Sequence, residues 1–142
     1  MAVVRKGLFR SLWLAALSKL GDSARTGKRG ERAAERWLKA RGYILETRNF
    51  RTRGGEADLI FAKDGRVVVV EVKTRTQSRF GAPQDAVTPV KQRRVLKAGM
   101  VFCRRRGIAF NRLRGDVVTV VFNHGKEDIR HYPGVMAFSS TR

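Results

Sequence analysis

Cysteine, acidic residues and long apolar runs are all scarce in this 142-residue sequence. The one cysteine, Cys103, excludes an internal disulfide and a cysteine-based zinc site, and it favours a reducing, cytoplasmic compartment. No apolar run approaches the ~20 residues of a transmembrane helix. Only 12 Asp and Glu oppose 31 Lys and Arg, and the net charge of +19 predicts a polyanionic partner. The hydrophobic fraction of 42% argues against a disordered basic tail.

The length predicts one domain with one active site or binding surface. We assign residues 29–138 to this domain, 1–28 to a basic N-terminal arm and 139–142 to a tail. The arm has an apolar stripe at helical spacing, which predicts an amphipathic or flexible segment. Basic residues crowd its apolar run, which argues against a secretory signal, and we do not expect the arm to contact a membrane. The stretch 27–30 is interpreted as a hinge into the domain.

Hydrophobic periodicity predicts an α/β domain. The predicted helices span 30–38 and 89–106, and the predicted strands span 43–50, 56–62, 67–74, 116–122 and 128–132. Thr88 and Pro89 are the N-cap and first residue of the second helix, and Gly107 ends it. Four consecutive valines, 67–70, indicate a strand that is covered on both faces of a sheet.

The segment 63–66 contains Asp-Gly between two strand patterns, which favours a two-residue type I′ turn. In that register Asp58 lies opposite Glu71, and Glu56 lies opposite Lys73. Opposed residues on one face have Cβ atoms about 4.5–5.5 Å apart. Two carboxylates at that distance repel each other unless a cation or a proton lies between them.

The spacing of Asp58, Glu71 and Lys73 is therefore interpreted as a metal site. Glu71 and Lys73 share a face of their strand, so two oxygen ligands and an ammonium converge. Mg²⁺, or Mn²⁺ in its place, binds one or two carboxylates together with water and substrate phosphate. Such an ion lowers the pKa of a bound water, and Lys73 would orient that water or stabilise the transition state. The alternative interpretation is that this spacing arises by chance and that the three residues do not form a site.

A further carboxylate comes from the first helix. On a helical wheel Glu31 lies about 20° from Leu38, at the edge of the apolar stripe, so it faces whatever the helix packs on. A first-turn acid that favours the helix dipole is the alternative interpretation. Glu35 falls further round the helix and is expected to point toward solvent.

The second helix carries a basic ridge, because residues 91–114 include nine Lys and Arg and no acidic residue. We predict contacts to nucleic-acid phosphates from this ridge and from basic residues near the strands. The predicted contacts are Arg53, Arg75, Lys91, Arg93, Arg94, Lys97 and Arg104. A solvated helix face is the alternative for the ridge, and Lys91 is near the helix start on the side that faces the sheet.

Four other polar or reactive residues have simpler interpretations. Asp116 begins a strand and is read either as the partner of a nearby arginine or as a site residue. His124 and His131 lack metal-ligand spacing, and Cys103 is expected to be inert in the core.

A family resemblance adds to these predictions. It is carried by Gly30-Glu31, Ala34, Leu38, Gly42-Tyr43, Asn49-Phe50-Arg51, Gly55 to Ile60, Val70 to Arg75, Lys91, Arg94 and Asp116-Val117-Val118, with His131 and Ala137-Phe138 near the end. Across residues 30–121 the chain resembles the YraN-type family of uncharacterised bacterial proteins. The resemblance implies the restriction-endonuclease-like fold, a central mixed sheet flanked by helices, with the PD-(D/E)xK constellation.

The implied active site is similar to that of archaeal Holliday junction resolvases. On this chain its catalytic residues are Glu31, Asp58, Glu71 and Lys73, with Asp58 and Glu71 as metal ligands. The proline of the PD signature is absent. Glu56 adds a second acid beside the site, and two interpretations stay open for it: an auxiliary group that assists the metal, or a partner of Lys73.

Two function classes follow, and a membrane-surface adaptor using residues 1–20 ranks below both. The first is a Mg²⁺-dependent endonuclease that hydrolyses phosphodiester bonds in DNA, including branched or structured DNA. The second is a non-catalytic nucleic-acid-binding module that recruits a protein partner through the arm. We expect DNA rather than RNA and no small-molecule cofactor. A homodimer is left open, by analogy with junction-cleaving relatives.

Overall fold

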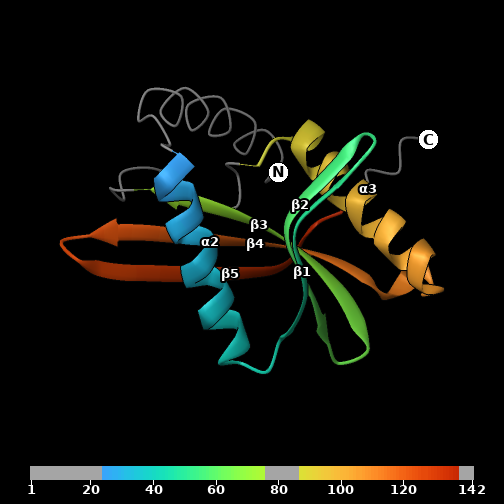
Figure 1. The fold of residues 1–142 in the computed structure, drawn as a ribbon, viewed down its shortest axis with the longest axis horizontal. Helices are drawn as coiled ribbons and strands as arrows, with labels where there is room; N and C mark the ends of the chain where they lie inside the picture. The colour runs from blue at the N-terminus through green and yellow to red at the C-terminus, as the bar shows by residue number, and fades with distance from the viewer. Residues whose placement is uncertain (1–23, 76–86, 138–142) are drawn as a thin grey trace, which may run out of the picture.

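A computed structural model describes residues 24–75 and 87–137 of the chain, which form one five-stranded sheet with helices against it (Figure 1). The sheet has the strand order β1-β2-β3-β4-β5, and only the β3–β4 pair is parallel. The strands are β1 (Ile44–Thr52), β2 (Gly55–Lys63), β3 (Arg66–Arg75), β4 (Leu113–Asn123) and β5 (Lys126–Met136). The helices are α2 (Ala24–Lys39), α3 (Pro89–Arg106) and the 3₁₀ turn η2 (Phe110–Arg112). The predicted α/β arrangement, a mixed sheet flanked by helices, is confirmed.

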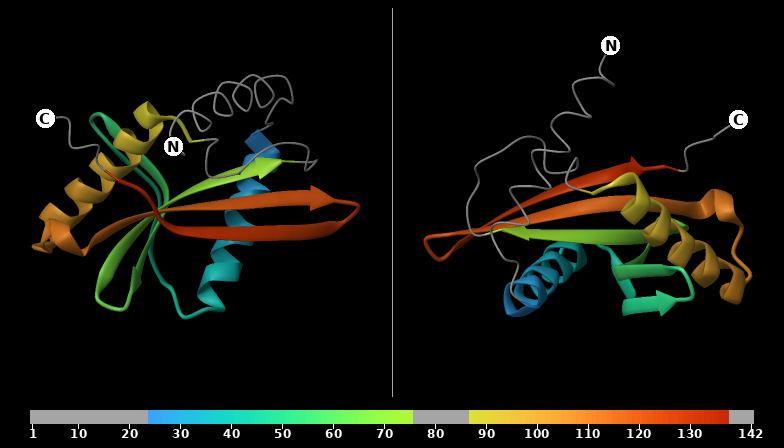
Figure 2. Two further views of the ribbon diagram at one scale, coloured as in Figure 1. Left: turned by 180° about the vertical axis from the view of Figure 1, so that it is seen from behind. Right: turned by 90° about the horizontal axis from the view of Figure 1, so that it is seen from above.

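The two long helices cover opposite faces of the sheet (Figure 2). Val67 and Val69 of β3 belong to the buried cluster that includes residues of α3. Val68 and Val70 belong to the cluster that includes residues of α2. Because successive side chains of a strand point to opposite faces, a strand with a helix on each side is apolar throughout. This arrangement explains the run of four valines.

Helix α3 begins and ends where the sequence predicts. The Thr88 side chain accepts a hydrogen bond from the Lys91 backbone N–H at 3.1 Å, and Pro89 follows as the first helical residue. Gly107 ends the helix with a φ of +66°, in the left-handed region that glycine tolerates.

The hinge predicted for residues 27–30 is wrong, because α2 runs unbroken through them from Ala24. Gly30 is buried against β3, and a Cβ added there would lie 1.8 Å from the Thr74 Oγ1 atom. This glycine therefore allows the helix to approach the sheet closely. The remaining residues of the predicted arm, 1–23, and the tail, 138–142, lie outside the described residues.

The turn between β2 and β3 has the predicted register, with Lys63 opposite Arg66 and pairing that continues to Leu59 opposite Val70. The ladder ends there, so the backbone pairing expected for Asp58 is not formed. Beyond this point β2 remains paired only with β1, and their hairpin lies beside α3 (Figure 1). The reason is a close contact: a Cβ on Gly55 would lie 2.8 Å from backbone atoms of α3. The sheet therefore splits between β2 and β3.

A buried polar network joins β4 to β5. Asp116 is fully buried and accepts two hydrogen bonds from the Arg114 guanidinium, at 2.9 and 2.8 Å, and one from the Gly134 N–H. The His131 Nε2 atom lies 2.7 Å from Asp116, and Arg114 also donates to the Tyr43 hydroxyl at 2.9 Å. Asp116 is thus the partner of an arginine, one of its two predicted interpretations. Buried Cys103 lies in the core, where burial raises the pKa of its thiol.

Candidate active site

The site begins at the split in the sheet. Where β2 leaves β3, the Val72 N–H of β3 donates a hydrogen bond to the Asp58 Oδ2 atom at 2.8 Å. A side chain therefore takes the place of the missing strand partner, because a buried backbone donor must be satisfied. This bond holds the Asp58 carboxylate next to the residue that precedes Val72, which is Glu71.

Asp58 and Glu71 form a carboxylate pair in which Glu71 is buried and Asp58 is partly buried. Glu71 is only 4% exposed, and its Oε2 atom is buried without a hydrogen-bond partner among the described residues. Burial, and then the charge of Asp58, raises the pKa of Glu71 to about 8. Burial also raises the pKa of Asp58, against the hydrogen bond from Val72. The predicted meeting of these two carboxylates is therefore present, although a side-chain bond rather than a regular ladder produces it.

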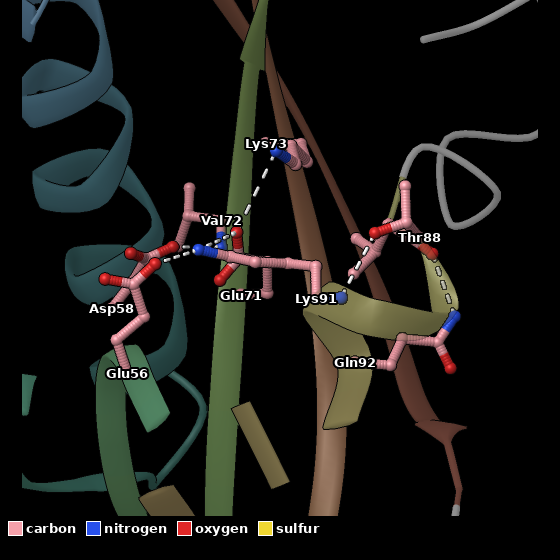
Figure 3. Close-up of polar contacts among 9 residues, drawn as sticks. Glu56, Asp58, Glu71, Val72, Lys73, Thr88, Lys91 and Gln92 are labelled. Atoms are coloured by element: carbon pink, nitrogen blue, oxygen red, sulfur yellow. Dashed lines mark hydrogen bonds and ion pairs between the residues drawn. The ribbon is translucent and has the colours of Figure 1, made fainter. Parts of the chain in front are cut away.

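Two lysines approach this pair (Figure 3). The Lys73 Nζ atom lies 3.8 Å from Glu71 Oε1, on the same strand. The Lys91 Nζ atom, which reaches in from α3, lies 3.8 Å from Glu71 Oε1 and 2.5 Å from Glu56 Oε1. Burial acts to lower the pKa of Lys91, but Glu71 and Glu56 outweigh it and raise that pKa, so the amine is charged.

The expected pairing of Glu56 with Lys73 is wrong. The split carries Glu56 toward α3, where Lys91 binds it and lowers its pKa. Lys91, predicted as a phosphate contact, thus lies inside the acidic cluster. The sequence signal for this was its place on the sheet-facing side of the second helix.

Glu31 faces the carboxylate pair from α2, as the helical wheel predicts. Burial, and then the charge of Asp58, raises its pKa. The expectation that Glu35 points to solvent is wrong, since Glu35 is 8% exposed. Both of its oxygens accept hydrogen bonds from the Arg48 guanidinium at 2.7 Å, which lower its pKa to about 2. The wheel could not show this, because Arg48 lies on a neighbouring strand.

The structure places the predicted nucleic-acid contacts in three different settings. Four of them are exposed along α3: Arg93, Arg94, Lys97 and Arg104. Arg53 is exposed in the turn between β1 and β2. Arg75, in contrast, is only 6% exposed at the end of β3, and burial lowers its pKa. Arg75 therefore does not share the open surface of the other arginines.

The carboxylate pair has the donor chemistry of a Mg²⁺ or Mn²⁺ site. In the part of the chain that the structure describes, no three His, Cys, Asp or Glu side chains converge as a metal-binding group. Mg²⁺, however, is held by one or two carboxylates and keeps several waters. The unpartnered Glu71 Oε2 beside Asp58 fits that requirement. Both carboxyls have raised pKa values, and a cation beside them would favour their ionised forms.

A split mixed sheet with a helix on each face, and two acids and a lysine at the split, defines a restriction-endonuclease-like α/β domain. Among the described residues, no helix is both long and apolar enough to cross a membrane. The family model of the uncharacterised protein family UPF0102 matches residues 30–120. The chain belongs to this family, which is the YraN-type family of the sequence analysis.

Relatives of the same family name occur in several bacteria. A UPF0102 protein of Syntrophomonas wolfei is 42% identical over 102 residues, which are 72% of this chain and 89% of the relative. A UPF0102 protein of Pelobacter propionicus is 40% identical over 113 residues, 78% of this chain and 81% of the relative. The solved structure described as "Crystal structure of SSO0001" has a TM-score of 0.39 and 18% identity, over 91% of this chain and 62% of that chain. That likeness is too slight to bear on function.

Proposed function

We propose that this protein is a Mg²⁺- or Mn²⁺-dependent endonuclease that hydrolyses phosphodiester bonds in DNA. One observation carries the proposal: the buried Glu71 Oε2 atom, which has no hydrogen-bond partner among the described residues, lies beside a second, partly buried carboxylate, Asp58. Such a pair is unfavourable unless a proton or a cation lies with it. The formal charge of +19 supports a polyanionic substrate, and the family name leaves the activity open.

The residues of the site have distinct roles in this proposal. A bound divalent ion would neutralise charge on the scissile phosphate and lower the pKa of a bound water. Asp58 and Glu71 would hold the ion, and Lys73 would orient the water or stabilise the developing charge. Glu31 adds a carboxylate from α2. The pair of Glu56 with Lys91 keeps an ammonium 3.8 Å from Glu71 and so limits the negative charge of the site.

A cleavage assay tests the proposal. Linear, nicked and four-way DNA is incubated with the full chain in Mg²⁺, Mn²⁺ or EDTA. Glu71→Gln removes a proposed ligand of the ion, and Lys73→Gln removes a charge that stabilises the transition state. Each is expected to lower the metal-dependent rate by about 100-fold or more. Glu46→Gln is the matched control, because Glu46 is exposed and, within the described residues, forms an ion pair with the exposed side chain of Arg106. Equal rates for wild type and all variants would refute the nuclease proposal.

A non-catalytic nucleic-acid-binding module is the second candidate. The exposed basic side of α3 favours this candidate. This side carries Arg93, Arg94, Lys97 and Arg104, and the sequence from 91 to 114 contains no acidic residue. For this candidate, affinity for DNA falls steeply with salt, and Lys97→Gln makes the salt dependence shallower by about one unit. Binding without cleavage would select this function. The same titration with RNA tests the preference for DNA, and sedimentation tests whether the chain forms a homodimer.

A further inference from the structure

A cavity of about 520 Å³ lies between α2 and β1, beside the carboxylate pair. Its lining includes Lys28, Glu31, Arg32, Arg36, Arg48 and Asn49. We propose that this cavity receives one unpaired nucleotide of the DNA strand that the site cuts. The inference rests on the proposed function and narrows its substrate class to DNA that has an unpaired segment.

Glu31 connects the cavity with the acidic cluster. It lines the cavity and is also close enough to Asp58 for that charge to raise its pKa. Leu59, the residue after Asp58, lines the cavity as well, and it pairs with Arg48 in the β1–β2 ladder. A nucleotide in the cavity would therefore be near the proposed cleavage site, on the side of Glu31.

Arg48 gives the cavity a fixed flat surface. Its guanidinium makes two hydrogen bonds of 2.7 Å to Glu35, whose pKa of about 2 keeps it ionised. Glu35 is itself buried and forms an ion pair with Lys39 at 2.8 Å, so the carboxylate that binds the Arg48 guanidinium is fixed in place. The Arg48 side chain is nevertheless 58% exposed. Unpaired bases stack on guanidinium planes of this kind. In this proposal, the buried Glu35 serves to hold the exposed Arg48 in position for such stacking.

The remaining cations suit the phosphate of that nucleotide. Lys28 and Arg32 are exposed on the same stretch of α2. Arg36 also lines the cavity and forms an ion pair with Glu127 at 3.2 Å. A volume of 520 Å³ is in the range of sites for small ligands of nucleotide size. A base inside a duplex would first have to leave the stack, so an unpaired nucleotide is the favoured occupant.

Binding measured in EDTA tests the inference apart from cleavage. Fluorescently labelled dT12 and a 20-base-pair duplex are titrated with the full-length wild type, Arg48→Gln, Lys28→Gln and Arg66→Gln. The first two variants are expected to bind dT12 about tenfold more weakly than wild type, as loss of a stacking or phosphate contact does. Their affinity for the duplex should change by less than about twofold. Arg66→Gln is the control, since Arg66 is exposed in the turn between β2 and β3.

The outcomes separate the two proposals. If wild type does not cleave DNA but Lys28→Gln and Arg48→Gln still lose dT12 selectively, the nuclease proposal fails and the cavity assignment stands. If cleavage occurs and dT12 affinity is unchanged in both variants, the cavity assignment fails alone. An equal loss for dT12 and duplex would also overturn it, because a general basic surface would then explain the binding. Lys28 is exposed on α2, so Lys28→Gln tests the inference even if Arg48→Gln does not fold.

Discussion

Replacing Glu71 by glutamine should stabilise the metal-free protein at alkaline pH. The folded protein holds this carboxyl at a pKa of about 8, well above its ordinary value of 4.5. Between those values the folded chain binds more protons than the unfolded chain, so the free energy of unfolding falls as the pH rises. Glu71→Gln keeps the shape of the protonated acid and removes this dependence.

The pKa of Glu71 sets the size of the effect. At about 1.36 kcal/mol for each pKa unit, the rise from 4.5 to about 8 means that the ionised Glu71 costs about 5 kcal/mol of stability above pH 8. Near pH 4.5 the carboxyl is protonated in the folded protein, so the variant and the wild type should differ by less than about 1 kcal/mol. For a domain of this length, about 5 kcal/mol corresponds to a rise in Tm of roughly 15 °C. The attraction of Lys73 and Lys91 is already included in this pKa.

Thermal unfolding in EDTA at pH 4.5, 6.5 and 8.5 measures the difference between Glu71→Gln and wild type. The difference should grow steadily across that range. Glu46→Gln is the control, since its surface ion pair with Arg106 is worth at most about 1 kcal/mol, and its effect should not grow in the same way. A Glu71→Gln variant that is no more stable than wild type at pH 8.5 would refute the claim that the buried, ionised Glu71 destabilises the folded protein.

Two further predictions concern packing and the buried network. Gly30→Ala should lower the free energy of unfolding by about 1–3 kcal/mol in urea denaturation, because its Cβ would overlap the Thr74 side chain. Gly27→Ala, with no atom within 4 Å of the added Cβ, should instead stabilise α2 by about 0.5–1 kcal/mol, and equal effects would contradict the packing. Asp116→Asn should cost about 3 kcal/mol in thermal unfolding, because it leaves the Arg114 charge without its buried partner, and a neutral result would oppose this.

Local sequence patterns predicted much of the fold because the determinants are local. The cap at Thr88, the stop at Gly107 and the turn at 63–66 each depend on a few adjacent residues, and all three are confirmed. The valines of β3 predicted a strand covered on both faces. The hinge predicted at residues 27–30 was wrong because glycine can serve either as a flexible joint or as a site of close packing. Only the position of Thr74 beside Gly30 shows that close packing is its role here.

The candidate site was predicted less completely, since long-range contacts complete it. The hairpin register brought Asp58 toward Glu71, but extrapolating it past Leu59 gave Glu56 the wrong partner. Contact between the β1–β2 hairpin and α3 ends the ladder, and no pattern within β2 records that contact. The partners Lys91 and Glu56 are 35 residues apart, so their bond is visible only in the folded chain.

The hydrogen bond from Val72 to Asp58 affects the choice of substitution for an inactive variant of the protein. Truncation to alanine at position 58 would remove the carboxylate and would also leave a main-chain amide of β3 without its acceptor. Loss of activity in such a variant would then mix two causes. The side-chain carbonyl of asparagine can still accept the hydrogen bond from the Val72 amide. Asp58→Asn therefore separates the chemical role of Asp58 from its structural role at the end of the β2–β3 pairing.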